Sequence, residues 1–273
     1  MARMNLKSTD LTDWLKTPPG EYLLAWENEQ FKDAVSDIFG YHALQLGLPE
    51  LNTLEANRMP HQWLALQSPC LPADTTTSSS RPRAALMTNS CALPFAENSL
   101  DLVVLAHTLE QSSDPHASLR EVERVLVPEG RVVISGLNPA SLWGMRQSRG
   151  HFYRRLGYDN MFLPEAGEFI GYWRLRDWLR LLNFEVESAR FGCYRPALTS
   201  QKWLSRFDWM DPCGKRWWPI FGAVYFVVAV KRVRGMRLLE APWSSRRPAA
   251  AAPVAVANKN PANPPAAKNK SLP

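Results

Sequence analysis

The stretch "DLVVLAHTLEQSSDPHASLREVERVLVPEGRVVISG", residues 101–136, carries the pattern that decides the fold of this chain. It opens with a continuous aliphatic run over residues 101–106, which is typical of a strand buried on both faces of a parallel sheet. A helix is expected next, with Asp114 as its N-cap and Pro115 at its first position. A second apolar strand is expected over residues 131–138. A strand, a helix and a strand with short connections form a right-handed crossover unit, so the pattern predicts an α/β fold with a parallel sheet.

Further helices and strands are expected on both sides of this unit, because the apolar residues recur there at helical spacing or in short runs. Amphipathic helices are expected over residues 20–38 and 174–183, and strands over 42–47, 62–67, 84–87, 184–192 and 223–232.

Two segments between these elements show no clear period. Residues 139–173 are rich in aromatic residues and glycine, which predicts a long loop that serves as a lid or binding element. A second loop insert, which carries four tryptophans, is expected between the last two strands. The predicted organisation is an N-terminal extension over residues 1–19, one folded domain over 20–235 and a disordered tail over 236–273.

The positive charge of the chain is concentrated in its tail. The formal net charge is +6, yet the five basic residues and no acidic residue after Glu240 leave a net charge of +1 for residues 1–240. The tail consists mainly of alanine, proline, asparagine and lysine, which bury too little apolar surface to offset the entropy of ordering. Nucleic-acid binding through this tail is a minor alternative, and the near-neutral folded part does not favour a nucleic-acid partner.

The cysteines and the apolar runs exclude several other classes. The four cysteines have neither C-x-x-C spacing nor a nearby histidine pair, so no metal site and no redox dithiol are predicted. The N-terminus has no apolar leader segment, and the longest apolar run, residues 220–230, is too short to span a bilayer. A cytoplasmic location without a transmembrane segment is therefore expected, and the sequence does not indicate an oligomeric state.

The run "ALPFAENSLDLVVLAHTLEQSSDPHASLREVERVLVPEGRVVISG", residues 92–136, resembles the type 11 family of class I S-adenosylmethionine-dependent methyltransferases. The resemblance rests on A-L-P-F, on the following aliphatic strand and on the R-V-L-x-P end of the helix. It implies a doubly wound, Rossmann-like, mostly parallel seven-stranded sheet in the order 3-2-1-4-5-7-6, with the last strand antiparallel. It also implies S-adenosyl-L-methionine as the cofactor.

The resemblance further implies cofactor-binding residues at the carboxyl ends of three strands. They are Gln45 and Gly47 after the first strand, Asn89 and Ser90 before A-L-P-F, and Leu105 and Ala106 at the end of the fourth strand. The sequence departs from the family pattern D-x-G-x-G-x-G, which reads "QLGLPEL" here, with proline at a glycine position. Amides, Gln67 and Asn89, replace two family carboxylates, and each keeps an oxygen that accepts hydrogen bonds but loses the negative charge.

His107 is the candidate catalytic residue. Ligands of open parallel sheets bind outside the carboxyl ends of the strands, and His107 directly follows such a strand. An imidazole titrates near neutral pH, so His107 is a candidate general base, or alternatively a residue that lines the pocket or caps a turn.

The predicted function is methyl transfer from S-adenosyl-L-methionine to a small-molecule acceptor. The alternative is a catalytically inactive methyltransferase-like module that binds a partner. A nicotinamide-dependent oxidoreductase is disfavoured because no G-x-G-x-x-G follows a predicted strand.

Overall fold

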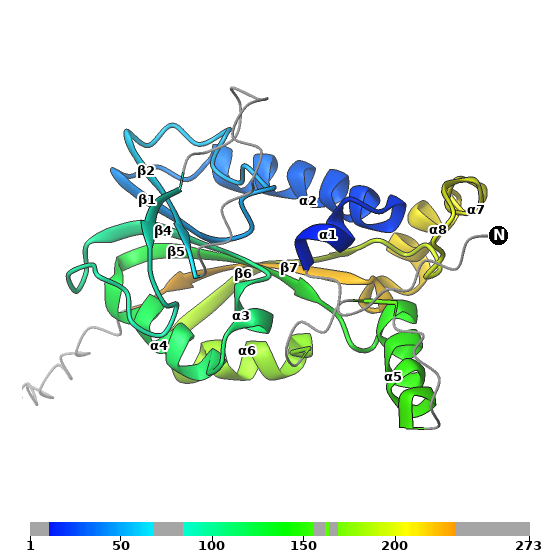
Figure 1. Cartoon of the computed structure of the whole chain (residues 1–273). Helices are drawn as coiled ribbons and strands as arrows, with labels where there is room; N and C mark the ends of the chain where they lie inside the picture. Colours follow the sequence, from blue (N-terminus) through cyan, green and yellow to red (C-terminus); the bar gives the residue numbers. More distant parts are fainter. Residues whose placement is uncertain (1–10, 68–83, 156–161, 164–168, 233–273) are drawn as a thin grey trace, which may run out of the picture. The chain divides into compact units, whose positions relative to one another are not determined.

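The described residues of the computed structural model, 11–67, 84–155, 162–163 and 169–232, form a seven-stranded sheet in the order β3-β2-β1-β4-β5-β7-β6 (Figure 1). The pairs from β3 to β5 are parallel, whereas β7 is antiparallel to both β5 and β6. The sheet confirms the expected strand order and the expected antiparallel last strand. The strands are β1 (His42–Gly47), β2 (His61–Leu66), β3 (Ala84–Met87), β4 (Leu100–Ala106), β5 (Leu126–Leu137), β6 (Phe184–Gly192) and β7 (Val224–Lys231).

Helices cover both faces of the sheet, as a doubly wound fold requires (Figure 1). The helices α1 and α2 lie over one face, and α3, α4 and α6 lie over the other. The helical elements are α1 (Leu11–Leu15), α2 (Pro18–Ser36), α3 (Thr108–Gln111), α4 (Pro115–Val125), α5 (Leu142–Arg155), α6 (Tyr172–Leu181), α7 (Gln201–Arg206), α8 (Met210–Trp217) and the 3-10 turn η1 (Pro219–Phe221).

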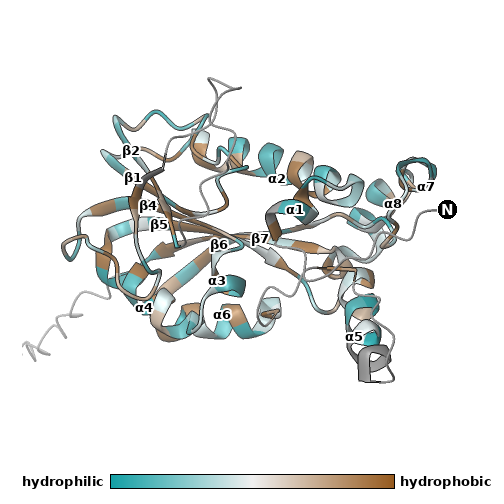
Figure 2. Ribbon diagram, viewed as in Figure 1, coloured by the Kyte–Doolittle hydropathy of each residue, from teal (hydrophilic) through white to brown (hydrophobic). Residues whose placement is uncertain are grey.

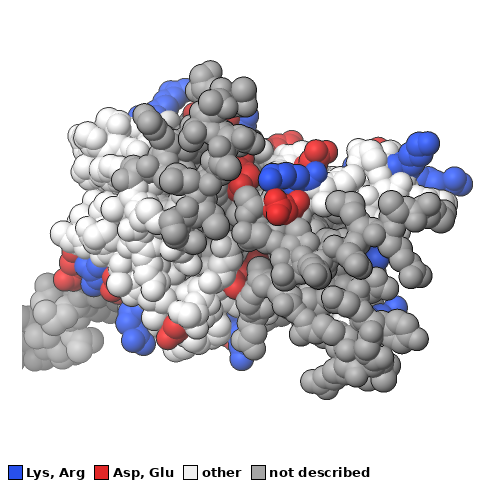
Figure 3. All heavy atoms as spheres, in the orientation of Figure 1, with Lys and Arg blue, Asp and Glu red and all other residues white. Residues whose placement is uncertain are grey.

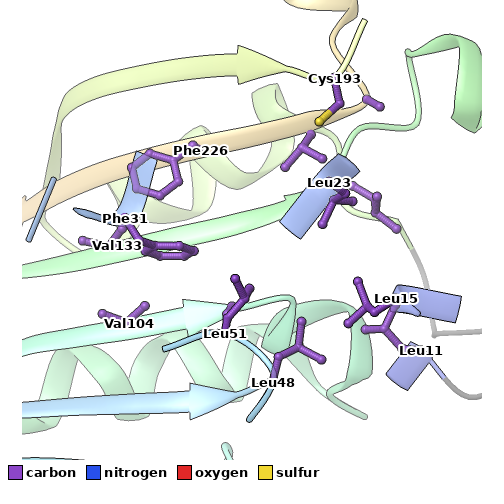
Figure 4. Packing of buried hydrophobic residues seen from close by; sticks show 14 of the residues in the cluster. Leu11, Leu15, Leu23, Phe31, Leu48, Leu51, Val104, Val133, Cys193 and Phe226 are labelled. Carbon is purple, nitrogen blue, oxygen red and sulfur yellow. The ribbon is translucent and has the colours of Figure 1, made fainter. Parts of the chain in front are cut away.

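Two hydrophobic clusters fill the spaces between the sheet and these helix layers. The α2-side cluster contains Phe31 from α2 and Phe226 from β7, whose rings meet edge to face with centroids 4.9 Å apart (Figure 4). The α4-side cluster contains Leu119 and Val122 from α4, which pack against alternate side chains of β4 and β5. The central strands are apolar on both faces, which Figure 2 shows as brown strands between helices with teal outer surfaces.

Local sequence signals account for the crossover unit as expected. Asp114 Oδ1 accepts a hydrogen bond from the backbone N–H of Ala117 at 3.0 Å, and Pro115 begins α4. The sequence placed the start of the following strand at Arg131, but β5 begins at Leu126. A register shift between Leu100 and Leu102 of β4 accommodates the extra residues of β5.

The prediction of one long loop over residues 139–173 is wrong for residues 142–155, which form α5. Ser141 was an available signal, because its Oγ accepts a hydrogen bond from the backbone N–H of Gly144 at 3.1 Å, as an N-cap does. Trp143 then buries its side chain in the α2-side cluster. The second insert, expected as a loop, contains the short helices α7 and α8.

Residues assigned to the N-terminal extension include α1, whose Leu11, Trp14 and Leu15 are buried in the α2-side cluster. All described residues belong to one compact unit. The tail predicted to be disordered lies outside the described residues.

Lys231 joins the end of β7 to the end of α4. Its Nζ is buried and donates to the backbone oxygens of Glu123 and Leu126, at 2.6 and 2.9 Å, and to Asn98 Oδ1 at 3.1 Å. The last carbonyls of a helix have no partner within the helix, so the ammonium group satisfies acceptors that the fold would otherwise bury unpaired.

We expect Lys231→Met to lower the free energy of unfolding by about 2–4 kcal/mol, because it leaves these buried carbonyls without a donor. Urea denaturation followed by circular dichroism measures the change. The control is Lys32→Met, since Lys32 is exposed and pairs with exposed Glu55 at 3.5 Å. We expect the control to change stability by less than about 0.5 kcal/mol. Equal effects of the two substitutions would contradict this account.

Candidate functional site

The candidate site lies at the carboxyl edge of β1, β4 and β5. Gly47, Ala106 and Ser135 are lateral neighbours across these strands in the register of the sheet. His107 continues β4 by one hydrogen bond, from its backbone N–H to the carbonyl oxygen of Ser135 at 3.1 Å. Its φ of 51° and ψ of 18° are left-handed, so the chain turns sharply here into α3. Such a backbone costs about 1–2 kcal/mol for a residue other than glycine, which side-chain contacts must offset.

The side chain of His107 forms two of these contacts, both with buried carboxylates. Its Nε2 lies 3.0 Å from Oε1 of Glu27 on α2, and its Nδ1 lies 3.0 Å from Oε2 of Glu110 on α3. All three side chains are at most 1% exposed. Glu110 Oε1 also accepts a hydrogen bond from the backbone N–H of Leu137. We call Glu27, His107 and Glu110 the buried ion cluster.

The buried ion cluster keeps His107 protonated. Burial alone would lower the pKa of His107, but the charges of Glu27 and Glu110 outweigh burial and raise the pKa well above its ordinary value. Two neighbouring acids stay neutral, because burial and the carboxylate charges both raise their pKa values. Burial, and then the charge of Glu27, raises the pKa of the Cys193 thiol; burial, and then the charge of Glu110, raises the pKa of the Tyr225 hydroxyl.

This arrangement gives His107 a different character from that of the predicted general base. Each ring nitrogen faces a carboxylate oxygen, so the imidazolium donates to both and has no free lone pair with which to accept a proton. The geometry is that of a cation that positions Glu27 and Glu110.

Three oxygen atoms near the ion cluster are buried and have no hydrogen-bond partner among the described residues. They are Oε2 of Glu27, Oγ of Ser135 and the hydroxyl oxygen of Tyr225. Ser135 lies two residues from Val133 and from Leu137 on β5, and both belong to the α2-side cluster, so its side chain points to the face that α2 covers. Buried polar atoms rarely lack partners, and the oxygens of Glu27 and Ser135 therefore indicate where a ligand on this face would supply hydrogen-bonding groups.

Gln45, a predicted cofactor ligand, instead organises the turn that follows β1. Its Nε2 donates to the carbonyl oxygens of Leu48 and Leu51, at 2.9 and 2.7 Å, and its Oε1 accepts from the backbone N–H and the hydroxyl of Thr53, at 3.2 and 2.8 Å. Only an amide can donate and accept in this way, because a carboxylate has no donor. The turn is thereby closed on itself, and the side chain of Leu51 is fully buried.

Gly47, Leu105 and Ala106 meet where β1 pairs with β4. Gly47 has a φ of +98°, and a Cβ atom there would lie 2.6 Å from the carbonyl oxygen of Ala106 and 2.7 Å from Oγ1 of Thr108. Glycine is therefore required at this position by the protein's own backbone. Leu105 and Ala106 are fully buried, and their side chains belong to the two hydrophobic clusters.

Gln67 and Asn89 follow β2 and β3 and lie at the same carboxyl edge. Gln67 Nε2 is buried and has no hydrogen-bond partner in the described part of the chain. Asn89 is exposed, and its Oδ1 accepts from the backbone N–H of Cys91 at 3.0 Å. Ser90 is buried and lies 2.8 Å from the hydroxyl oxygen of Ser118, so its hydroxyl group has a protein partner.

The sequence did not single out Glu27 as a functional residue. The buried face of α2 contains Leu23, Glu27 and Phe31 at spacings of four residues. A carboxylate in the middle of a buried helical face was the available signal, because such a group is almost never buried without a partner.

Comparisons with known proteins agree with this fold. Residues 72–134 match the family described as "Methyltransferase domain". The uncharacterized protein YafS of Escherichia coli K12 is 32% identical over 181 residues, which are 65% of this chain and 67% of YafS. The ubiquinone/menaquinone biosynthesis C-methyltransferase UbiE of Hahella chejuensis is 46% identical over 46 residues, which cover 17% of this chain and 18% of that protein.

A solved structure from Thermotoga maritima, described as a methyltransferase that depends on S-adenosylmethionine and as a possible histamine N-methyltransferase, superposes with a TM-score of 0.52. It is 14% identical and the match covers 77% of this chain and 92% of that one, so it bears on the fold alone. The family match and these relatives show that the chain belongs to the type 11 family of class I methyltransferases, whose members use S-adenosyl-L-methionine as the methyl donor.

The residues at the carboxyl edge fit this cofactor at its adenosine end. The resemblance implies a contact with the ribose at the end of β2, and there the buried Nε2 of Gln67 is a donor without a hydrogen-bond partner among the described residues. The turn after β1 differs, because Gln45 and Leu51 close it from within. The hydrogen-bond donors at this edge therefore favour contacts with the nucleoside part of the cofactor over contacts with its methionine part.

The buried ion cluster predicts a pH dependence of stability. The pKa of His107 is raised in the folded protein relative to its value near 6.5 in the unfolded chain. The ion pairs of protonated His107 therefore contribute fully to the free energy of unfolding below pH 6.5. This contribution is lost as the pH rises through the pKa of His107 in the folded protein. We expect Glu27→Gln to lower the free energy of unfolding at pH 6 by about 1.5–3 kcal/mol and to flatten its decline at alkaline pH.

Urea denaturation at a series of pH values measures both effects. Glu29→Gln is the matched control, because Glu29 lies on the same helix but is exposed. A variant of Glu27 that keeps the alkaline slope of the unsubstituted protein would show that the buried ion cluster is not the origin of that slope.

Proposed function

We propose that the chain transfers a methyl group to a small-molecule acceptor bound at the carboxyl edge of β4 and β5. The observation that carries the proposal is the unpartnered Oε2 of Glu27 within the buried ion cluster. A carboxylate oxygen removed from water without a donor is costly, so a ligand that brings an N–H or O–H group would be stabilised there. The unpartnered Oγ of Ser135 on the same face supports a polar acceptor.

Gln67 and Asn89 are the residues that we assign to the adenosine part of the cofactor. Gln67 Nε2 would donate to a ribose oxygen, and the amide of Asn89 would face the adenine edge. Gln45 and Gly47 act indirectly, because they determine the course of the turn beside this site. When bound, the cofactor supplies a methyl group that its positively charged sulfur makes electrophilic.

Glu27 is the group that we assign to proton transfer. An acceptor that gains a methyl group on nitrogen or oxygen must release a proton, and Glu27 Oε2 is an acceptor for it. His107 is a positioning residue in this scheme: it donates to Glu27 and Glu110 and holds both carboxylates at the strand ends. Orientation of the acceptor in a site shielded from water supplies the remaining acceleration.

The names of similar proteins support a small molecule as the acceptor. The demethylmenaquinone methyltransferase of Chlamydia pneumoniae, 43% identical over 47 residues, and UbiE are both named for quinone substrates or their biosynthesis. Quinols offer O–H groups, which would complete the hydrogen bonding of Glu27.

A second candidate function is an inactive module that retains the fold. The observation that favours it is the turn after β1, where Leu48 and Leu51 are buried in the α2-side cluster. The two candidates differ in one property, since only the enzyme must bind the cofactor.

We expect calorimetric titration with S-adenosylhomocysteine to show binding and Gln67→Leu to weaken it about tenfold, because the substitution removes a buried donor. Gln62→Leu is the control, since Gln62 lies at the other end of β2 and its Nε2 donates to the backbone oxygens of Asn57 and Met59, at 2.9 and 3.3 Å. Absence of binding at millimolar S-adenosylhomocysteine would overturn the proposal that the chain is an enzyme and would favour the inactive module. Binding that Gln67→Leu does not weaken would refute the assignment of Gln67 alone.

A further inference from the structure

Residues 201–221 present large apolar side chains to solvent. They form α7, α8 and η1, between β6 and β7. Their exposed fractions range from 41% to 73%, whereas a soluble protein normally buries such groups. We define the aromatic surface as Trp203, Trp209, Trp217, Trp218, Ile220 and Phe221.

Polar contacts hold this segment in place and leave its apolar groups outside. Asp211 Oδ1 accepts from the hydroxyl of Tyr22 at 2.5 Å and from the backbone N–H of Tyr194 at 3.2 Å. Asp211 Oδ2 accepts from Nε of Arg195 at 2.9 Å. Gly214 of α8 packs against the ring of Tyr194, where a Cβ atom would lie within 2.4 Å of the ring. The exposure of the tryptophans is therefore a property of an anchored segment.

The charges around the aromatic surface are predominantly basic. Lys202, Arg206, Lys215 and Arg216 are exposed. The acidic residues of the segment, Asp208 and Asp211, both form ion pairs with Arg195. Figure 3 shows basic side chains at the end of the molecule where Figure 1 places α7. The surface thus combines aromatic rings with cations that have no ion-pair partner among the described residues.

We propose that the aromatic surface docks on the interface of an anionic lipid bilayer. Tryptophan side chains combine a large apolar body with one N–H group and settle at the boundary of headgroups and acyl chains. Lysine and arginine stems extend along such a boundary while their charges reach anionic headgroups. A second copy of the chain is a poorer occupant, because it would bring the same positive charges together.

The aromatic surface lies at the same sheet edge as the candidate site. Nδ2 of Asn138, directly after β5, donates to the carbonyl oxygens of Ile220 and Gly222 at 2.7 and 2.9 Å. The preceding residue, Leu137, donates its backbone N–H to Glu110 of the buried ion cluster. Docking would therefore turn this edge of the sheet toward the bilayer. No helix in the described residues is long and apolar enough to cross a membrane, so the contact is peripheral.

Sedimentation with phospholipid vesicles tests the proposal without cofactor or acceptor. We expect the full chain to bind phosphatidylcholine vesicles that contain phosphatidylglycerol and to bind pure phosphatidylcholine at least about tenfold more weakly. The double variants Trp217→Ser/Trp218→Ser and Lys215→Glu/Arg216→Glu should each reduce binding to the anionic vesicles about tenfold or more.

The control double variant is Trp173→Ser/Arg180→Glu, which changes an exposed tryptophan and an exposed arginine on α6. Circular dichroism checks that all variants fold. Every variant keeps the basic tail, so any contribution of the tail to vesicle binding is the same in all of them. Equal binding by the control and by the surface variants would overturn the proposal. Dimerisation that the surface variants abolish, without vesicle binding by the unsubstituted protein, would also overturn it and assign the surface to a second copy.

Discussion

The ion pairs of one imidazolium with two buried carboxylates hold the functional edge of this protein together. Glu27 comes from a helix that precedes the sheet, whereas His107 and Glu110 come from the turn after β4. The contacts attach α2 to the strand ends and offset the left-handed backbone of His107. The burial of two carboxylates and one imidazolium also carries a desolvation cost. The ion pairs offset this cost only while all three groups are present. A site built in this way is polar, dry and positioned before any ligand arrives.

The turn after β1 shows how a family motif changes when its partners change. A carboxylate at the position of Gln45 would only accept hydrogen bonds, but the turn here requires two donors for the carbonyl oxygens of Leu48 and Leu51. The amide therefore stabilises a turn whose side chains join the hydrophobic cluster. Gly47 is retained for a related reason, since the backbone of β4 occupies the space that a side chain would need. In the proposed function, cofactor recognition then depends more on Gln67 and Asn89, at the ends of β2 and β3.

The insert between β6 and β7 links the sheet edge to an unusual surface. Asp211 of this insert binds Arg195, Tyr194 and Tyr22, whereas the tryptophans and the basic side chains of the insert are exposed. Large aromatic side chains are normally buried, so this group of exposed rings is unusual. The same edge thus brings together a buried charged site and an exposed aromatic surface, and α5 and the ends of β5 and β6 connect them.

The sequence by itself determined the crossover unit, because this unit depends on short-range signals, namely apolar runs and the Asp114 cap. The strand order was implied only by the resemblance of one contiguous motif to a known family, and the structure has that order. The sequence also located the edge at which His107 lies. Helix α5 was missed because its glycines and weak amphipathic pattern obscure the Ser141 cap. Only the tertiary structure decided that Glu27 reaches His107 across 80 residues and that the imidazole has no free nitrogen. Likewise, the number of tryptophans is visible in the sequence, whereas their exposure is not. Protonation state and exposure depend on which groups packing brings together, and packing is set by the whole chain.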